Sequence, residues 1–416
     1  MRRSIRYLFY LMIVPFITRA QIELLPVKHE ANVILNAASL NKVFALLSKN
    51  KETVIPVFHF GDSHIQADHF TGEIRKLLQQ SFGNAGRGLV FPYYQAKTNG
   101  PKDYVFKSTQ KWISKKIVKS SGNIFCGIAG YTLLVDPIGR DFSLEYMPKP
   151  DSGQVAGNNK VIQLIYETVG EVPEINVFNP LTGSFAKPEG HRNYHVINKD
   201  SFVFADTAKQ FNIIINRTNH PQLLLDGMVL SNGKNGLIYN SAGVNGAKFI
   251  QFLHTPKFFE ELTFLKPALV IISLGTNESA GRYDSLEFIL TVDSLVRAIE
   301  IMGSTVLLTT PANNYLSHKS YKYTIKKGRK RRVKTRIYVH NETVKMIRDN
   351  LVAYCHARGL PCWDLYTVMG GDYSMKTWIE AGKGAKDHLH FSKGGYIFQG
   401  QLFYSAFYAA YLKYVN

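Results

Sequence analysis

The strongest constraint on the fold is a regular alternation of apolar runs and helix-length segments in the second half of the chain. The near-continuous apolar run at 268–274 is typical of a strand buried on both faces of a sheet. Strand-like and helix-like segments follow one another in the order 236–241, 247–262, 268–274, 285–301, 305–310, 341–357 and 362–366. Such alternation predicts an α/β domain with a parallel sheet covered by helices on both faces.

A further strand of the same kind lies near the front of the chain. The run Val54–Phe58 leads into Phe60-Gly61-Asp62-Ser63, and a helix-like segment follows at 68–81. A serine between a buried strand and a helix lies at the sheet edge where α/β proteins bind ligands. Its neighbouring backbone N–H groups are then free to hold an oxyanion, which makes Ser63 a candidate nucleophile. The plainer alternative is a strand-end turn with a helix-capping serine.

The segment between these two parts of the α/β pattern has a different character. Short β-like runs recur at 124–126, 131–135, 142–146, 161–166, 175–178, 194–197, 202–205, 211–215 and 222–225. Many short strands separated by turn residues indicate a β-sandwich or jelly roll. We therefore expect an inserted all-β module at 100–232, flanked by two parts of one α/β domain at 21–99 and 233–416. Helices are also expected at 31–48 and 396–414.

The N-terminus resembles an export signal. Arg2, Arg3 and Arg6 precede an apolar stretch, and Thr18-Arg19-Ala20 offers small residues for cleavage. We expect residues 1–20 to be removed, with an uncleaved anchor as the alternative, and no later transmembrane segment. The mature chain is then an exported, periplasmic or cell-envelope protein, expected to be a monomer.

The formal net charge of +19 is concentrated in one short stretch. Residues 319–336 contain ten Lys or Arg and no Asp or Glu, with a Gly turn between two β-like runs. This pattern predicts an exposed hairpin or long loop. It is either a solvated excursion or a surface that attracts a polyanion, such as an acidic glycan, a wall polymer or an anionic membrane surface. Nucleic acid is not an expected partner, because an exported chain rarely meets it.

Three cysteines, Cys126, Cys355 and Cys362, form neither a disulfide framework nor a metal-binding spacing. Cys355 and Cys362 are either a pair in an oxidising compartment or two inert buried thiols. Neither a metal ion nor another cofactor is expected.

The candidate partners of Ser63 lie far from it in sequence. A serine hydroxyl needs a base to take its proton, and a third group to orient that base. Asp387-His388-Leu389-His390 offers both, with Asp387 able to support the His390 imidazole in a tight turn. Gly246 and Asn277 each follow a predicted strand, so a backbone N–H and a side-chain amide can complete an oxyanion hole with the Ser63 N–H. Each of these residues has a plainer alternative as a cap or turn residue.

Taken together, these stretches resemble the blocks of the SGNH/GDSL hydrolase family. Gly61-Asp62-Ser63 is similar to its nucleophile block, Asn245-Gly246-Ala247 and Gly275-Thr276-Asn277-Glu278 to its oxyanion blocks, and Asp387–His390 to its Asp-x-x-His block. The resemblance implies a flavodoxin-like α/β/α fold. The opening Gly61–Gln66 and the β-insert further resemble bacterial envelope O-acetylesterases of peptidoglycan, in which the insert is carbohydrate-binding-like.

The resemblance implies acyl transfer through an acetyl-serine on Ser63, with His390 as base, Asp387 as its orienting group, and Gly246 and Asn277 in the oxyanion hole. The expected substrate is an acetylated glycan, with an acidic glycan as one option. Three alternatives stay open: an O-acetyltransferase with the same residues, a non-catalytic glycan-binding protein, and a lipase or thioesterase. His64, Gln66 and Arg87 are further candidates for the cleft wall, without an assigned role.

Overall fold

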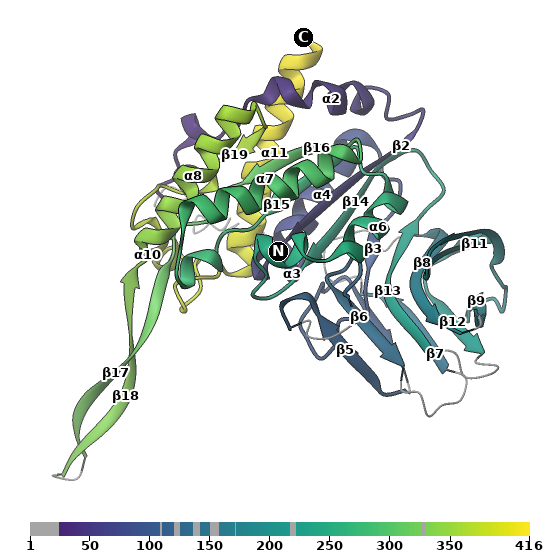
Figure 1. Cartoon of the computed structure of the whole chain (residues 1–416), viewed down its shortest axis with the longest axis horizontal. Helices are drawn as coiled ribbons and strands as arrows, with labels where there is room; N and C mark the ends of the chain where they lie inside the picture. Colours follow the sequence, from purple (N-terminus) through teal and green to yellow (C-terminus); the bar gives the residue numbers. More distant parts are fainter. Residues whose placement is uncertain are drawn as a thin grey trace, which may run out of the picture.

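The structure is a computed structural model that describes residues 25–108, 110–119, 125–135, 142–149, 158–170, 172–216, 222–326 and 329–416. The predicted signal segment 1–20 lies outside this range. The central feature is a six-stranded sheet, parallel except for its edge strand β1 (Figure 1). Its strands follow the spatial order β1 (Ile34–Leu35), β19 (Cys362–Trp363), β16 (Thr305–Thr309), β15 (Leu269–Ser273), β2 (Val54–Gly61) and β14 (Gly236–Gly243).

The order of the five parallel strands determines where a ligand can bind. Numbered along the chain, β2 comes first, β14 second and β15 third, so the spatial order is 2-1-3-4-5. The chain leaves β2 in one direction for β14 and later returns on the other side for β15. In doubly wound sheets this reversal opens a crevice at the carboxyl ends of the strands. The α/β sheet predicted from the sequence is confirmed, and Ser63 follows the strand at the reversal.

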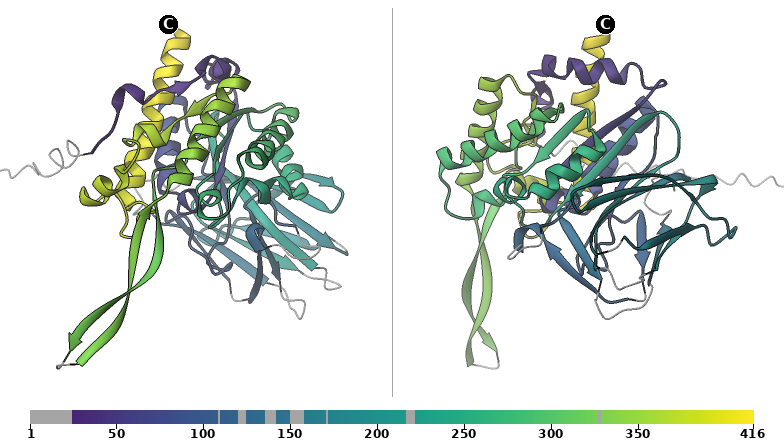
Figure 2. Two further views of the ribbon diagram at one scale, coloured as in Figure 1. Left: turned by 60° about the vertical axis from the view of Figure 1, so that its left-hand side comes forward. Right: turned by 45° about the vertical axis from the view of Figure 1, so that its right-hand side comes forward.

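Helices cover both faces of this sheet (Figures 1 and 2). Successive strand residues point to opposite faces, so Val57 and Ile271 join one apolar cluster while Phe58 and Ile272 join the other. The first face packs against α2 (Asn41–Leu47), α4 (His69–Phe82), α10 (Ser374–Glu380) and α11 (Lys393–Val415). The second face packs against α5 (Phe249–Leu253), α6 (Pro256–Leu265), α7 (Ser285–Ile301) and α8 (Glu342–Arg358).

Two antiparallel sheets occupy the segment between α4 and β14, which we call the β-segment (residues 88–231). One sheet has the order β10-β11-β8-β13-β6-β5, with β3 paired to β13, and the other has the order β4-β7-β12-β9. The strands are β3 (Gly88–Val90), β4 (Tyr104–Lys107), β5 (Trp112–Lys116), β6 (Tyr131–Val135), β7 (Phe142–Pro148), β8 (Asn159–Val169), β9 (Glu174–Phe178), β10 (Lys187–Tyr194), β11 (Ile197–Ala208), β12 (Phe211–Asn216) and β13 (Gln222–Ser231).

The β-segment is not a separately cored unit. Its buried side chains, among them Tyr166 and Leu225, belong to the same apolar cluster as Phe60 and Phe258 of the α/β part. The pairing also begins with β3, before the predicted start at residue 100. The β-segment therefore packs directly onto the α/β part through shared apolar contacts.

A second insertion projects from the body. Strands β17 (Tyr315–Lys326) and β18 (Arg329–His340) form a two-stranded antiparallel sheet. This ribbon extends away from the molecule in every view (Figures 1 and 2). Among the described residues, no helix combines the length and apolarity needed to cross a membrane.

Several expected elements differ from the structure. The predicted helix at 31–48 is wrong in its first half, because Asn36 adopts a left-handed conformation between β1 and a 3-10 helix at Ala37–Leu40. The predicted helix at 247–262 breaks at Thr255-Pro256 into α5 and α6, since proline cannot continue a helix. The run at 194–197 is not one strand, because Tyr194 ends β10, Ile197 begins β11 and the two residues between them form a turn.

Shorter elements complete the fold: the 3-10 helices His29–Ala31, Ile117–Lys119 and Glu278–Ala280, and the helices α3 (Ser63–Gln66) and α9 (Leu365–Val368). Cys126, Cys355 and Cys362 are buried free thiols.

Candidate active site

Ser63 lies at the first turn of α3, directly after β2 at the sheet reversal. The Asp62 carboxylate accepts a hydrogen bond from the His64 N–H at 2.9 Å, which caps this short helix. Gly61 is required for space, because a Cβ there would collide with the Ser273 carbonyl oxygen and with Ile65. The tight turn places Ser63 at the surface of the crevice, where its side chain is partly exposed.

The structure brings the predicted base to this serine. The Ser63 Oγ lies 2.9 Å from His390 Nε2, across 327 residues of sequence. On the other side of the ring, His390 Nδ1 lies 2.7 Å from Asp387 Oδ2. The three side chains form a continuous hydrogen-bonded line from a carboxylate to a hydroxyl. This is the geometry that a serine nucleophile and its base require.

The loop that carries Asp387 and His390 is closed by its own hydrogen bonds. The Asp387 Oδ1 accepts the backbone N–H groups of Leu389 and His390 at 3.0 and 2.9 Å. The Ala385 N–H donates to the His390 carbonyl at 2.8 Å and ties the two ends together. With His390 on Oδ2 and two amides on Oδ1, both carboxylate oxygens are occupied and the rotamer of Asp387 is fixed.

These contacts set the charge states of the pair. The hydrogen bond to Asp387 raises the pKa of His390 above its usual 6.5, against the opposing effect of burial. The hydrogen bond from His390, with those of the two backbone amides, holds the pKa of Asp387 well below its usual range. Asp387 therefore stays ionised, and His390 binds a proton more readily than a free imidazole.

Two backbone N–H groups that are expected in the oxyanion hole have no hydrogen-bond acceptor among the described residues. No described residue accepts a hydrogen bond from the N–H of Ser63 or from the N–H of Gly246. Gly246 has a φ of +84°, in the region that favours glycine. A Cβ there would meet only Val118, at 3.8 Å, so the backbone conformation rather than space calls for glycine.

Asn277 reaches the same region from the end of β15. Its Nδ2 donates to the Ala247 carbonyl at 2.9 Å and contacts Asp62 Oδ2 at 3.4 Å. The amide nitrogen is thereby held beside the Ser63 turn and next to Gly246. The three residues expected around an oxyanion are thus neighbours, although the Asn277 amide is engaged with protein groups in this structure.

Buried carboxylates lie behind this region. Burial raises the pKa of Asp62 to about 6 and that of Glu278 to about 7. Glu278 accepts the Phe249 N–H at 2.8 Å, which fixes the start of α5 just after Gly246. The sequence marked Glu278 only as part of a four-residue block, and nothing in its local pattern indicated this contact.

The structure also places the unassigned candidates. Gln66 links three segments, because its Oε1 accepts the Asn245 N–H at 2.6 Å and the Tyr131 hydroxyl at 3.0 Å. His64 stands with its ring centroid 5.2 Å from that of His390, and its Nδ1 lies 3.0 Å from the Tyr396 hydroxyl. Burial lowers the pKa of His64 to about 3, so it stays neutral.

Arg87 is not a cleft residue. It is buried beneath the site and binds Asp68 and Asp103 at 2.8 and 2.6 Å. Arg75 binds the same Asp68 at 2.6 Å. The network joins the start of α4 to the β-segment.

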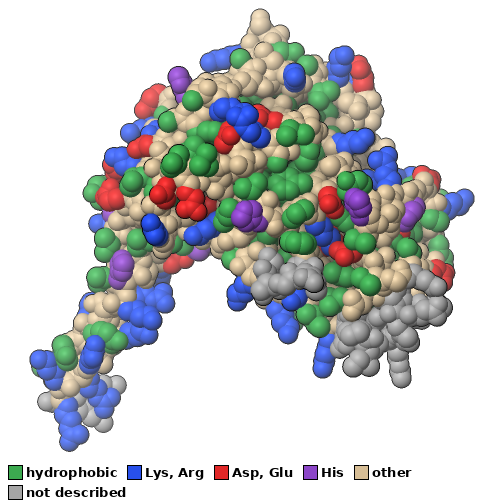
Figure 3. Space-filling view, in the orientation of Figure 1, with side chains coloured by type: hydrophobic (Ala, Val, Ile, Leu, Met, Phe, Trp, Pro, Cys, Tyr) green, Lys and Arg blue, Asp and Glu red, His purple; other side chains and the backbone are tan. Residues whose placement is uncertain are grey.

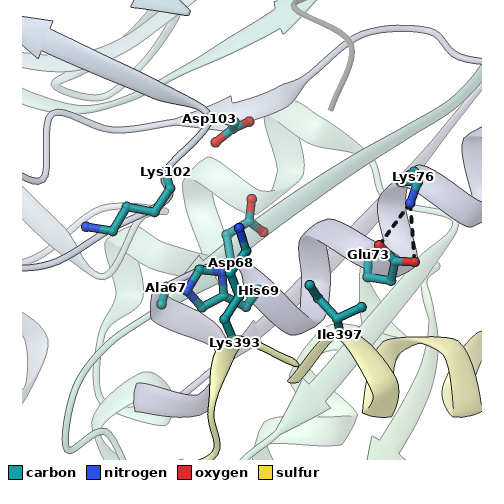
Figure 4. A pocket seen from close by; sticks show the side chains of 9 residues that line it. All are labelled: Ala67, Asp68, His69, Glu73, Lys76, Lys102, Asp103, Lys393 and Ile397. Carbon is teal, nitrogen blue, oxygen red and sulfur yellow. Dashed lines mark hydrogen bonds and ion pairs between the residues drawn. The ribbon is translucent and has the colours of Figure 1, made fainter. Parts of the chain in front are cut away.

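A small hollow lies beside this network (Figure 4). It has a volume of about 50 Å³, enough for water but not for a sugar ring. Asp68 and Asp103 are paired to arginines and Glu73 to Lys76, whereas no described carboxylate forms an ion pair with Lys102 or Lys393. Figure 4 shows both lysines near His69, with Lys393 only three residues after His390.

The ribbon is connected to the loop that carries His390. The Tyr315 N–H donates to the His388 carbonyl at 3.0 Å. The Tyr338 ring stacks on His388 with centroids 4.0 Å apart and planes 16° apart. His388 has a φ of +59°, which an L-residue rarely adopts, so these two contacts help to hold it. Sequence reasoning missed this connection because the ribbon and the loop are some fifty residues apart.

Comparison with known proteins gives a likeness in fold. No protein-family model matches the sequence, and no curated protein matches it. A solved peptidoglycan O-acetylesterase superposes with a TM-score of 0.70 at 18% identity, covering 94% of this chain and 99% of that chain. The resemblance proposed from the sequence blocks is thus confirmed at the level of the fold.

Two other solved structures match a smaller part. An acetyl xylan esterase covers 41% of this chain and 81% of its own, with 16% identity and a TM-score of 0.32. A GDSL-like lipase from Bacteroides thetaiotaomicron covers 41% and 76%, with 22% identity and a TM-score of 0.30.

Proposed function

We propose that this protein is a serine esterase of the SGNH/GDSL type that removes O-acetyl groups from a cell-envelope glycan. The observation that carries the proposal is the line from Ser63 Oγ to His390 Nε2 and from His390 Nδ1 to Asp387, at the reversal of the sheet. The likeness in fold to a peptidoglycan O-acetylesterase over nearly the whole chain supports an envelope glycan as substrate.

The first half-reaction follows from the geometry. Ser63 Oγ attacks the acetyl carbonyl carbon while His390 Nε2 takes the hydroxyl proton, and ionised Asp387 stabilises the imidazolium. The negative charge moves to the carbonyl oxygen, within reach of the N–H groups of Ser63 and Gly246. The Asn277 amide supplies a third donor by turning from the Ala247 carbonyl. Such preorganised donors stabilise the transition state more than the ground state.

Collapse of the tetrahedral intermediate completes the first half-reaction, and a second half-reaction with water then restores the enzyme. As the tetrahedral intermediate collapses, the bond between the acetyl carbon and the sugar oxygen breaks. The sugar oxygen takes the proton from His390 Nε2 and leaves as a hydroxyl group. Water then attacks the acetyl-serine, giving its proton to His390, and a second collapse releases acetate while Ser63 Oγ regains the proton. Each step uses one base, one proton and one acyl group, so the cycle closes on the residues already described.

The test is acetate release from an O-acetylated glycan by the purified chain. We expect Ser63→Ala to lower kcat by about 10⁴-fold or more, because nucleophile and base act as a unit. Ser48→Ala is a matched control, since the Ser48 hydroxyl is exposed and bonds only to the Ala45 carbonyl. Retention of full activity by Ser63→Ala would eliminate the proposal. Acetyl gain on an added sugar, instead of acetate release, would replace hydrolysis by transfer.

A further inference from the structure

The ribbon formed by β17 and β18 carries a high positive charge that does not stabilise the ribbon itself. Eight cations with described side chains lie on it, and the sequence 315–340 contains no Asp or Glu. The eight are Lys319, Lys322, Arg329, Lys330, Arg331, Arg332, Lys334 and Arg336. None forms an ion pair with a described carboxylate. A two-stranded ribbon is only marginally stable in water, and uncompensated like charges weaken it further.

The strand register places these cations on both faces. Lys319 pairs directly with Arg336, so two like charges oppose each other on one face. Lys334 and Arg332 lie on that face too, opposite Tyr321 and Tyr323. The other face carries Lys322, Arg329 and Arg331. Figure 3 shows Lys and Arg gathered on the part of the ribbon that lies away from the body.

Exposed aromatic and apolar side chains accompany the cations. Tyr323 and Ile325 are 63% and 81% exposed, near the far end of the ribbon. The Arg332 guanidinium lies 3.5 Å from the centroid of Tyr321, and the Lys330 amine lies 4.7 Å from that of Tyr323. Cation–π contacts of this kind hold the charges in place on the surface. The face therefore offers fixed positive charges alternating with rings.

We propose that the basic ribbon binds a glycan polymer whose sugars carry carboxylate groups. Lys and Arg neutralise the carboxylates, and the exposed tyrosines contact the sugar rings. A phosphate polymer without sugar rings would use only the charges. A flat anionic membrane would meet one face of the ribbon, whereas cations project from both faces. A strand of twelve residues extends roughly 40 Å, so the ribbon reaches several sugar units away from the body.

The root of the ribbon gives this binding a consequence. Because Tyr315 and Tyr338 hold the loop of His390, a polymer on the ribbon is tethered to the part of the molecule that carries Ser63. Tethering raises the effective concentration of the polymer's own acetyl groups. This consequence, unlike the binding itself, rests on the proposed esterase function.

The binding test compares two variants of the full chain with equal loss of charge. The ribbon variant replaces Lys330, Arg332, Lys334 and Arg336 by Gln, and the body variant replaces the exposed Lys42, Lys49, Lys51 and Lys413 by Gln. The probe is polygalacturonate, with dextran as the neutral polymer. We expect the ribbon variant to lose about tenfold or more in affinity and the body variant about twofold, since the ion contacts are local. Dextran should bind neither.

Equal losses in both variants would overturn the proposal, because net charge alone would then explain the binding. Binding to phosphatidylglycerol vesicles without binding to polygalacturonate would replace the glycan by a membrane. A third variant, Tyr321→Ser with Tyr323→Ser, leaves the charge unchanged. It should bind polygalacturonate more weakly but polyphosphate as well as the native chain, and equal binding of both polymers would contradict the role of the rings.

A rate measurement separates this proposal from the esterase. The native chain should deacetylate O-acetylated polygalacturonate faster than the ribbon variant, with equal rates on 4-nitrophenyl acetate. If neither the native chain nor the ribbon variant hydrolyses either ester, while the native chain still binds polygalacturonate, the proposed function fails. The ribbon's role as a glycan-binding surface then stands.

Discussion

The two insertions in the α/β part use charge in opposite ways. Where the β-segment packs on α6, charges are buried and paired: Lys257 of α6 lies 2.7 Å from both Asp226 and Glu167, and Glu261 accepts the Ile128 N–H at 2.5 Å. In the ribbon, the cations face solvent and no described carboxylate pairs with them. One insertion shares the apolar core of the body, and the other touches the body only at its root.

The comparison shows that the role of a charged side chain depends on whether an oppositely charged side chain pairs with it. The paired charges at the junction with α6 hold the β-segment against the α/β part. The unpaired charges of the ribbon are left for a ligand, on the side of the site that carries His390. The candidate site therefore lies between the β-segment, which shares the core of the body, and the ribbon, which contacts the body at its root.

The largest effect is expected where the buried pairs are broken. Lys257→Met leaves Asp226 and Glu167 without their cation, which costs about 3–5 kcal/mol in the free energy of unfolding. Lys330→Met, a matched change on the ribbon, should cost less than about 0.5 kcal/mol. Urea unfolding of both variants measures the difference. Similar costs would show that the two insertions hold their charges alike.

The root of the ribbon provides the next test. Tyr338→Ala removes the ring that stacks on His388, so we expect kcat for an acetyl ester to fall about tenfold through misplacement of His390. KM should stay the same, because the substrate contacts are unchanged. Tyr338→Phe keeps the stacking ring and should retain activity. A loss that is equal in both variants would argue against stacking as the cause.

The pH profile sharpens the contrast. His390 must be neutral to accept the Ser63 proton, and its pKa is raised by Asp387, so kcat/KM should fall as the pH drops through a value above 6.5. Asp387→Asn removes the carboxylate that raises the pKa of His390. The fall in kcat/KM on the acid side of the profile should therefore move to lower pH. In the ribbon variant, the fall in kcat/KM should stay at the same pH as in the native chain, since salt screens exposed charges. A shift of this fall in that variant would show that the ribbon controls His390 electrostatically.

The smallest effect is expected from the ribbon on simple chemistry. Turnover of 4-nitrophenyl acetate by the ribbon variant should stay within about twofold of the native value, because surface charges away from the site contribute little to it. Initial rates at saturating ester measure this. A tenfold loss of turnover would mean that the ribbon takes part in the reaction itself.

Much of the α/β part could be predicted because its signals are local. The runs at 54–61 and 268–274 are short and nearly continuously apolar, which is typical of a parallel strand covered on both faces. Ser63, Gly246, Asn277 and the Asp387–His390 pair each follow a strand or precede a helix, so their chain positions indicated one sheet edge. The structure brings these residues together.

The remaining features depend on partners far away in the chain. The helix at 31–48 was expected from apolar spacing, but the edge pairing of β1 with β19 prevails over that pattern. The stack of Tyr338 on His388 and the burial of Arg87 and Lys257 arise from contacts between segments that no local pattern links. For the ribbon, the sequence predicted an exposed hairpin or long loop but not where its root is attached.

The central claim is that Ser63 carries the acetyl group. The most direct test is to mix the chain with an acetyl ester, quench in acid within one turnover, and locate the label by peptide mass spectrometry. We predict one acetyl group on the peptide that contains Ser63, and none on that peptide in Ser63→Ala. Acetate release with the label on another residue, or with an unlabelled Ser63 at every quench time, would contradict the account.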